Sequence, residues 1–522
     1  MLQRNNIIEL RAAAKPKTPI FKGFARGADL VWGALGNPEM SEQIIQRTGR
    51  ITDSQAAMPW IVAAAIYTLL MVLGPRLLAD PDTYSHIALG RWILQHHAVP
   101  SVDPFSQTMR GAPWIAFEWL SQVAYAAALW LGGWTGVVAL AAAAVAAAFG
   151  LLTRFLLRQW QPVPTLIAVL AAFVLASPHI LARPHVLALP LLTAWVASLI
   201  GAVDERRAPS WHLLPLMTLW ANLHGSFTFG LAIVGVIACE ALWNAPPAER
   251  LRVAAQWALF GLAALVAACV NPSGPAIILV TFKTAALGDA LSIITEWRPQ
   301  DFSHLGAFEM IMLASFGYAL FRGVRLPPLR ILMLFGVLHL GLSQSRHADL
   351  VGLLVPIFLA RPLAEQFKSL VAAPFEDARM AAWLPAMAGL LLIGVTGFAA
   401  ARADMTPAAN ITPAAALSSF DATKSGPILN DYGFGGYLDF AGIAPFIDGR
   451  GELYGSVFTM RHHRALSLQN VPDFLTMLDE YKFGATLLSP GTPAIGLLDR
   501  LPEWQRVYSD SVAVVHLRRR VP

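Results

Sequence analysis

A succession of long apolar segments between residues 56 and 401 constrains this chain more than any other feature of its sequence. The first, residues 56–78, is long enough to cross a bilayer, since a membrane-spanning helix needs about 20 mostly apolar residues. Hydrophobic residues make up 56% of the chain and charged residues 14%, which excludes a soluble globular protein. The sequence therefore predicts an integral membrane protein that crosses the bilayer as α-helices.

The distribution of lysine and arginine orients these segments. Basic residues cluster between apolar segments, as at Arg206 and Arg207, and the positive-inside rule places such loops in the cytoplasm. Every later loop obeys this rule only if residues 119–131 lie along the outer surface and turn at Gly132 and Gly133 instead of crossing. The predicted spans are 56–78, 135–157, 163–181, 186–203, 211–223, 226–243, 254–270, 305–321, 329–344, 347–361 and 381–401, about eleven helices. The basic pI of about 9.3 follows from this topology, so no nucleic-acid partner is expected.

The composition changes along the chain and defines its parts. They are a cytoplasmic tail (1–55), an all-α polytopic membrane domain (56–401) with a large first periplasmic loop (79–134), and a small periplasmic α/β domain (402–522). In the last part, the pattern predicts strands at 426–430, 445–448, 485–488 and 512–516 and a helix at 472–481. Gly433, Gly435 and Gly436 predict tight turns there.

Nearly every unusual polar cluster falls on the outer face in this topology. The topology itself was derived from the positions of lysine and arginine alone. Ionisable groups at or near membrane depth are costly and usually mark a site or a pathway. We therefore expect the clusters to share an outward-facing cavity. Their residues of interest are Asp80, Asp82, His86, Asp103, Glu118, Arg183, His185, Asn222, His224, Glu296, Arg298, Arg346 and His347.

The pair Asp80 and Asp82 follows the first span directly and precedes a segment, 83–97, with helical periodicity. Either residue could simply cap this helix, and Asp82 is the expected N-cap. Asp82 also shares a helical face with His86, four residues on, which could orient its carboxylate. A carboxylate here could accept a proton from a hydroxyl nucleophile or ligate a divalent cation such as Mg²⁺ or Mn²⁺. Both interpretations stay open.

Arg183 and His224 lie at the ends of spans and each has two interpretations. Arg183 precedes a proline, and its guanidinium could hold a phosphate through two N–H groups. Together with His185 it could equally anchor the helix at the membrane interface. His224 is either a buried core histidine or, with Asn222 beside it, part of a helix end that opens into a polar space.

Two further outer clusters and one in the tail complete the set. Glu296 and Arg298 could pair with each other at the surface. Arg346 and His347 lie between two apolar runs, which favours a site. The densest polar group of the C-terminal domain is either a binding loop over the site or a structural turn held by an Asp–Arg pair. Its members are Asp448, Arg450, Glu452 and Tyr454.

Three strings of the first outer loop carry a resemblance to a known family: Asp80-Pro81-Asp82-Thr83-Tyr84-Ser85-His86, Asp103-Pro104-Phe105-Ser106 and Glu118-Trp119-Leu120. With the outer polar clusters, they resemble the GT-C superfamily of polyprenyl-phosphate-dependent membrane glycosyltransferases, which includes protein O-mannosyltransferases and oligosaccharyltransferases. The stretches 220–225, 271–274 and 448–454 resemble the same bacterial branch, whose substrate is unassigned. The resemblance covers most of residues 57–522.

The resemblance implies that an acid of the first outer loop activates the acceptor, which corresponds to Asp80 or Asp82. The proline between them departs from the adjacent acid pair of the mannosyltransferases, so the choice stays open. A second acid, present after the third span in oligosaccharyltransferases, has no counterpart at Arg183-Pro184-His185. The resemblance therefore assigns no metal ligands, and a divalent cation stays an open alternative.

The sequence thus predicts a GT-C glycosyltransferase of the bacterial inner membrane. It would move a hexosyl or pentosyl group from a polyprenyl-phosphate-linked donor to a periplasmic glycan, lipid or protein acceptor, with membrane lipids around it. The alternatives are a transporter or flippase, or a non-catalytic assembly protein, for a lipid-linked polysaccharide. The catalytic candidates are Asp82, Asp80, His86 and Glu118. The candidates for substrate or phosphate binding are Arg183, His185, Asn222, His224, Glu296, Arg298, Arg346 and His347.

Overall fold

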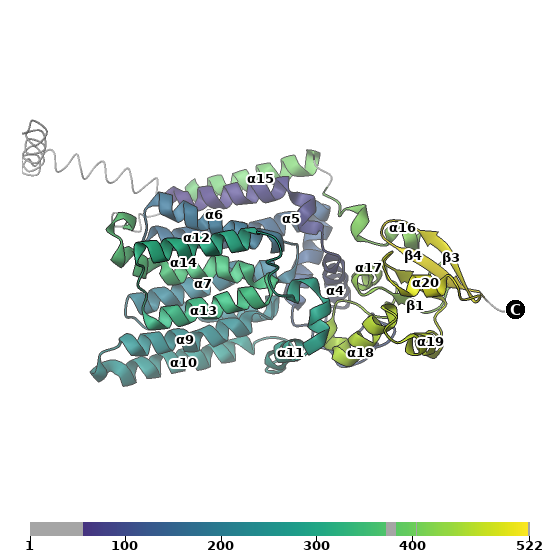
Figure 1. Ribbon diagram of the computed structural model, residues 1–522. Coiled ribbons are helices and arrows are strands. Elements are labelled where there is room, and N and C mark those ends of the chain that lie inside the picture. The colour runs from purple at the N-terminus through teal and green to yellow at the C-terminus, as the bar shows by residue number, and fades with distance from the viewer. Residues whose placement is uncertain (1–55, 372–382, 403–404, 520–522) are drawn as a thin grey trace, which may run out of the picture. The chain divides into compact units, whose positions relative to one another are not determined.

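The computed structural model describes residues 56–371, 383–402 and 405–519, so the predicted tail 1–55 lies outside the described residues. A bundle of long helices precedes a smaller part that contains the β-sheet (Figure 1). A helix lies at each predicted span: Ala56–Val72, α5 (Trp119–Leu157), α6 (Pro162–Ala176), α7 (Pro184–Asp204), α8 (Leu214–Leu223), α9 (Phe227–Asn244), α10 (Arg250–Ala268), α12 (Ala307–Arg322), α13 (Pro328–Ser343), α14 (Ala348–Gln366) and α15 (Trp383–Arg402).

Not all of these helices are long enough to cross a membrane. Within the described ranges, six helices are both long and apolar enough: α5, α7, α9, and α6, α10 and α14 with their adjoining 3₁₀ turns. Helix α8 has 10 residues and rises only about 15 Å, half of a bilayer core. The described residues are therefore consistent with a helical membrane domain and contain six helices fit to span, so eleven spans are not shown.

Helix α5 contains the turn that the sequence predicts at its glycine pair. Gly132 has φ −140° and Gly133 has φ +58° with ψ −154°, a conformation that side chains disfavour. A side chain at Gly136 would lie 2.2 Å from the carbonyl oxygen of Ala128. In a straight helix, residues eight apart are separated by about 12 Å along the axis. The chain therefore folds back at the pair, and 119–131 and 134–157 are two helices.

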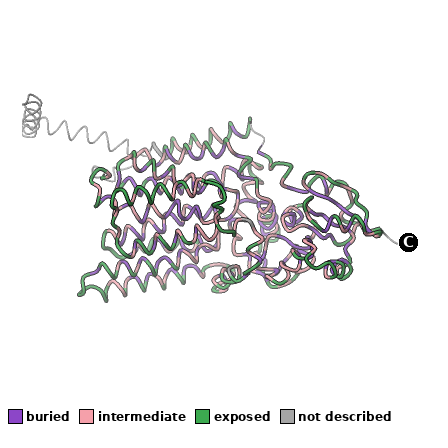
Figure 2. Tube along the Cα trace, in the orientation of Figure 1, coloured by how far each residue is buried: buried purple, intermediate pink, exposed green. Residues whose placement is uncertain are grey.

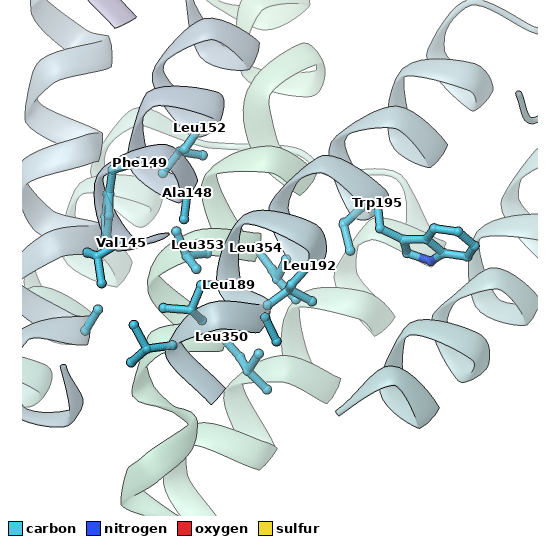
Figure 3. Close-up of a cluster of buried hydrophobic side chains, with 14 of the residues drawn as sticks. Val145, Ala148, Phe149, Leu152, Leu189, Leu192, Trp195, Leu350, Leu353 and Leu354 are labelled. Carbon is cyan, nitrogen blue, oxygen red and sulfur yellow. The ribbon is translucent and has the colours of Figure 1, made fainter. Parts of the chain in front are cut away.

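Helices α5, α7 and α14 form the centre of the bundle. Their facing side chains are buried and interdigitate, among them Phe149, Leu192 and Leu353 (Figure 3). Exposed residues follow the outer sides of helices such as α10 and α15 (Figure 2). Many of these exposed residues are apolar, as at Leu262 and Ile393, which suits helices that face lipid.

Arg330 corrects one detail of the predicted topology, which places it in a cytoplasmic loop. It is buried within α13, where its guanidinium donates to Glu240 at 2.6 Å, to Asp204 at 2.7 Å and to the carbonyl oxygen of Phe358 at 3.0 Å. A buried guanidinium requires such partners, because an unpaired charge is very costly away from water. Arg330 therefore joins α7, α9, α13 and α14 instead of marking a loop.

The C-terminal part holds a four-stranded sheet in the order β1-β2-β4-β3. Strands β1 (Ile428–Asn430) and β2 (Ala485–Leu488) are parallel, whereas β4 (Val514–Arg518) pairs antiparallel with both β2 and β3 (Trp504–Ser509). Three predicted strands and the predicted helix, α19 (Val471–Glu480), are confirmed. Strand β3 escaped prediction because it is a largely exposed edge strand with few apolar residues. The other helices of the C-terminal part include α16 (Ala414–Leu417), α18 (Gly451–Leu466) and α20 (Ala494–Leu498), whereas α11 (Ala276–Ala285) follows α10.

The strand predicted at 445–448 is wrong, because its backbone finds partners outside the sheet. The carbonyl oxygens of Pro445 and Phe446 accept hydrogen bonds from Gln107 N–H and Thr108 Oγ1, at 2.9 and 2.8 Å. The side chain of Asn430 takes up the N–H of Phe446 at 2.7 Å. This segment therefore joins the C-terminal part to the first loop.

The turns predicted at Gly435 and Gly436 are also wrong, since both residues begin helix α17 (Gly435–Phe440). They are small for a packing reason: a side chain at Gly436 would lie 3.1 Å from the carbonyl oxygen of Pro81. Helix α17 packs closely on helix α4 (Asp82–His96), and the ring of Tyr84 contacts that of Phe440, with centroids 5.0 Å apart. The two helices lie between the bundle and the sheet (Figure 1).

Candidate functional site

A cavity of about 1260 Å³ lies between the ends of the bundle helices and the C-terminal part. Its walls come from the start of α4, the N-terminal ends of α7 and α14, the segment after α8, and residues 449–452, where helix α18 begins. The structure thus brings most of the polar clusters together at one cavity, whereas Asp103, which the sequence analysis grouped with them, does not line it. Ten of the twelve candidate site residues line it: Asp80, Asp82, His86, Glu118, Arg183, His185, His224, Glu296, Arg346 and His347.

The structure places the other two candidates outside the cavity. The side-chain amide of Asn222 donates to the carbonyl oxygens of Thr218 and Val270, at 2.7 and 2.9 Å, and its oxygen accepts from Trp119 at 2.7 Å. Asn222 therefore serves helix packing. Arg298 is exposed and donates to the carbonyl oxygen of Ser292 at 3.0 Å, so the expected pair with Glu296 does not form.

Arg183 is the centre of the charged network. Its Nη1 donates to Asp80 Oδ2 at 3.0 Å and to Glu296 Oε2 at 2.6 Å, and its Nη2 donates to Asp82 Oδ2 at 2.8 Å. These three carboxylates raise the pKa of Arg183, although burial by itself would lower it. Within the described residues, Nε has no protein partner, which leaves an N–H group for a ligand.

The backbone around Arg183 is tied to the segment that carries the two aspartates. Ala182 donates its N–H to the carbonyl oxygen of Leu77 at 2.7 Å and accepts from Thr83 Oγ1 at 3.1 Å. The carbonyl oxygen of Arg183 itself accepts from Tyr125 at 3.0 Å. Pro184 then starts α7, where proline is favoured because its missing N–H needs no partner. The approach of the guanidinium to the acids is therefore built into both segments.

Asp80 and Asp82 differ in how their oxygens are used. Asp80 Oδ1 accepts the N–H of Asp82 at 2.8 Å and Oδ2 accepts from Arg183, so both oxygens are engaged. The expected N-cap role of Asp82 is therefore wrong: Asp80 receives that N–H, and Asp82 is the first helical residue of α4. Oδ1 of Asp82 has no partner in the described part of the chain. Burial raises the pKa of Asp82 to about 7, Arg183 lowers it, and the neighbouring Asp80 raises it further.

Glu118 lies between two histidines. His224 Nε2 is 3.4 Å from Glu118 Oε1, and His86 Nδ1 is 3.9 Å from Oε2. Because His224 Nδ1 accepts the N–H of Ser226 at 3.2 Å, its proton is assigned to Nε2, facing Glu118. Burial raises the pKa of Glu118 to about 8 and lowers that of His86 to about 3. The cluster is therefore largely uncharged at neutral pH, and His86 faces Glu118 and Gln122 instead of orienting Asp82.

A second guanidinium stands beside the first. Arg346 Nη1 is 3.4 Å from Glu296 Oε1, and its guanidinium carbon lies 4.6 Å from the ring centre of Trp297. Burial opposes the charge of Glu296, but Arg183 and Arg346 outweigh it and lower the pKa of Glu296. Glu296 thus bridges the two arginines and stays ionised.

The C-terminal part forms a further wall, and its polar group combines the expected Asp–Arg pair with residues that line the cavity. Arg450 donates to Asp448 and Asp103, each at 2.6 Å, which is a structural ion-pair network. Glu452 accepts from Trp114 Nε1 at 3.0 Å and lines the cavity. A side chain at Gly449 would lie 2.8 Å from Asp82 Oδ1. The backbone at Gly449 therefore lies close to the same carboxylate that Arg183 binds.

The carboxylates do not fit a divalent cation as they are arranged. In the ranges that the structure describes, no group of three or more His, Cys, Asp or Glu side chains is arranged to hold a metal ion. Asp80, Asp82 and Glu296 direct oxygens at the guanidinium of Arg183 instead. A divalent cation among them would lie against a like charge, which is unfavourable.

Some lining residues were not among the candidates. Gln122, His179 and Tyr432 also line the cavity. Burial raises the pKa of Tyr432 well above its usual value, so it stays a neutral hydroxyl donor. Tyr432 follows strand β1 in a short polar string, which is a common place for binding residues. His179 precedes Arg183 by four residues at the same predicted outer end. This proximity in the sequence could have identified it as a site residue.

Comparison with known proteins identifies the fold. No family model matches the chain, and no curated protein matches its sequence. Among solved structures, the apo crystal structure of the oligosaccharyltransferase of Archaeoglobus fulgidus is similar, with a TM-score of 0.50 and 12% sequence identity. The match covers 83% of this chain and 69% of that one. At this identity the likeness concerns the fold alone, and it shows that the chain is folded like that oligosaccharyltransferase.

Proposed function

We propose that this protein is a membrane glycosyltransferase that moves a sugar from a polyprenyl-phosphate-linked donor to an acceptor hydroxyl. The observation that carries the proposal is the pairing of Asp82 with Arg183 in the wall of the cavity, 2.8 Å apart. It sets a group able to accept a proton beside a group able to bind a phosphate. The GT-C-like fold supports the same activity.

Asp82 is the base in this proposal. Its Oδ1 is available, whereas both oxygens of Asp80 are engaged. A general base works best when its pKa lies near the operating pH, and that of Asp82 is raised to about 7. The acceptor oxygen attacks the anomeric carbon and its proton passes to Asp82. The bond from the anomeric carbon to the phosphate oxygen breaks, and polyprenyl phosphate leaves.

Arg183 and Arg346 bind the leaving phosphate in this proposal. Charge develops on the phosphate oxygen as the bond breaks, and preorganised donors in a shielded site stabilise it. Arg183 Nε is available for this role, and Arg346 stands on the far side of Glu296. The neutral pair of Glu118 and His224 keeps this wall from adding further negative charge.

The donor class follows from location and lining. With the cavity on the periplasmic side of the inner membrane, cytoplasmic nucleotide sugars are out of reach, whereas a lipid-linked sugar is present in the membrane. The wall between α7, α9 and α13 carries apolar side chains that suit a polyprenyl chain, among them Leu192, Phe229 and Leu340. The acceptor, a glycan, a lipid or a protein, would then approach from the side of residues 449–452.

The test is mass spectrometry of lipid extracts from a strain that lacks this gene. The strain accumulates the lipid-linked sugar, and the wild-type gene removes it. Asp82→Asn is expected to slow transfer by about 10²–10⁴-fold, the usual contribution of a general base, while the protein still accumulates in the membrane. Asp301→Asn is the matched control, because Asp301 is exposed and does not line the cavity. Full activity of Asp82→Asn, Asp80→Asn and the double variant refutes the proposal.

A further inference from the structure

Three acids of the cavity, Asp80, Asp82 and Glu296, come from two separate segments and meet at one point. Asp80 and Asp82 precede and begin α4, and Glu296 belongs to the 3₁₀ turn Thr295–Trp297. Three carboxylates repel one another unless a cation lies between them. The group between them is the guanidinium of Arg183, within 2.6 to 3.0 Å of one oxygen of each.

From this geometry we infer that Arg183 is the resident cation of the site and does the work of a divalent metal ion. A metal ion in such a cluster would hold the carboxylates together and attract the phosphate. Arg183 does the first with both Nη atoms and keeps Nε for the second. Only the second role rests on the proposed function.

The backbone hydrogen bonds around Arg183 fix where its guanidinium lies relative to the two aspartates. Hydrogen bonds from Ala182 to Leu77 and from Thr83 to Ala182 join the two segments on either side of the aspartates. The guanidinium is therefore delivered to the acids by the fold itself. A planar guanidinium also gives each carboxylate a directed N–H, which a spherical ion does not.

The charge balance agrees with a chain-borne cation. With Arg346, the second guanidinium at Glu296, two arginines face three carboxylates, and burial raises the pKa of Asp82 to about 7. An added divalent ion would meet two positive groups, since Arg183 and Arg346 lie 2.6 and 3.4 Å from the two carboxylate oxygens of Glu296. The inference is therefore that transfer needs no added metal.

The test uses the full-length protein in detergent and Mn²⁺ as the probe. Electron paramagnetic resonance measures free Mn²⁺, and thermal unfolding measures stability. We expect that Asp80 and Asp82 bind no Mn²⁺ in the wild-type protein. The double variant Asp80→Asn/Asp82→Asn should therefore bind as much Mn²⁺ as wild type. Chelation should also leave the Tm of wild type unchanged. Stoichiometric Mn²⁺ binding that the double variant loses overturns the inference.

A rescue experiment gives the complementary result. Arg183→Ala leaves the three carboxylates without their cation, so its Tm should fall, and millimolar guanidinium ion should restore it better than Mn²⁺. Equal or better restoration by Mn²⁺ overturns the inference. If this variant does not fold, the wild-type measurement decides alone. Neither experiment uses turnover, so full activity of Asp82→Asn, Asp80→Asn and the double variant would refute the proposed function and leave these results standing.

Discussion

The ion pairs of Arg450 offer the sharpest test of how the C-terminal part is held over the cavity. Arg450 joins Asp448 of its own loop to Asp103 of the first loop, each at 2.6 Å, and both carboxylates are 0% exposed. Arg450→Met keeps an aliphatic side chain of similar length but removes the guanidinium, which lies 4.8 Å from the ring centre of Trp114. Two carboxylates are then left buried without their partner.

The expected loss follows from this burial. Removing one partner of a buried ion pair costs about 3–5 kcal/mol, because the remaining charge is uncompensated. Each 1.4 kcal/mol is a factor of about ten, so the open form of the C-terminal part should become at least about 10²-fold more populated. Arg461 in helix α18 is the matched control. It also pairs with two carboxylates, Asp473 and Glu480, but they are 28% and 44% exposed. Arg461→Met should cost at most about 1 kcal/mol.

Limited proteolysis of the purified protein measures this difference, because cleavage follows the population of the open form when opening is fast. Arg450→Met should release C-terminal fragments about 10²-fold faster than wild type, and Arg461→Met should differ little. The double variant Arg450→Met/Asp103→Asn should recover part of the loss, since it removes one of the stranded charges. Equal cleavage rates for the two single Met variants would refute the reasoning.

Further predictions concern the cavity and the topology. Gly449→Ala should lower transfer more than tenfold, roughly the effect of displacing a general base, because its Cβ would lie 2.8 Å from Asp82 Oδ1. Gly433→Ala, whose Cβ would lie 3.8 Å from Asp431 Oδ1, an ordinary van der Waals distance, should not. Glu118 has its pKa raised from 4.5 to about 8, so folding favours its protonated form and stability should fall as pH rises toward 8. Glu118→Gln should flatten the Tm between pH 6.5 and 8. A reporter fused after Phe398 should be periplasmic, and a cytoplasmic signal there would contradict the shared outer compartment.

Local features of the sequence determined most of the secondary structure. The apolar segments set the helices of the bundle, because a long apolar run can satisfy its backbone inside a membrane only as a helix. Gly132 and Gly133 marked the fold-back of α5, because the backbone there adopts a positive φ. The positions of the basic residues between the apolar segments were enough to predict that Asp80, Arg183 and Arg346 lie at the same end of the bundle.

Tertiary structure decided what those residues contact. Sequence spacing alone favoured contacts of Asp82 with His86 and of Glu296 with Arg298. In the fold, Asp82 and Glu296 both accept hydrogen bonds from Arg183, which lies at the start of another helix. The segment 445–448 has a strand pattern, yet the first loop and Asn430 take its backbone groups. A side chain's partner depends on which distant segments meet it, and burial then sets its charge. Sequence patterns report only the neighbours along one helix or strand.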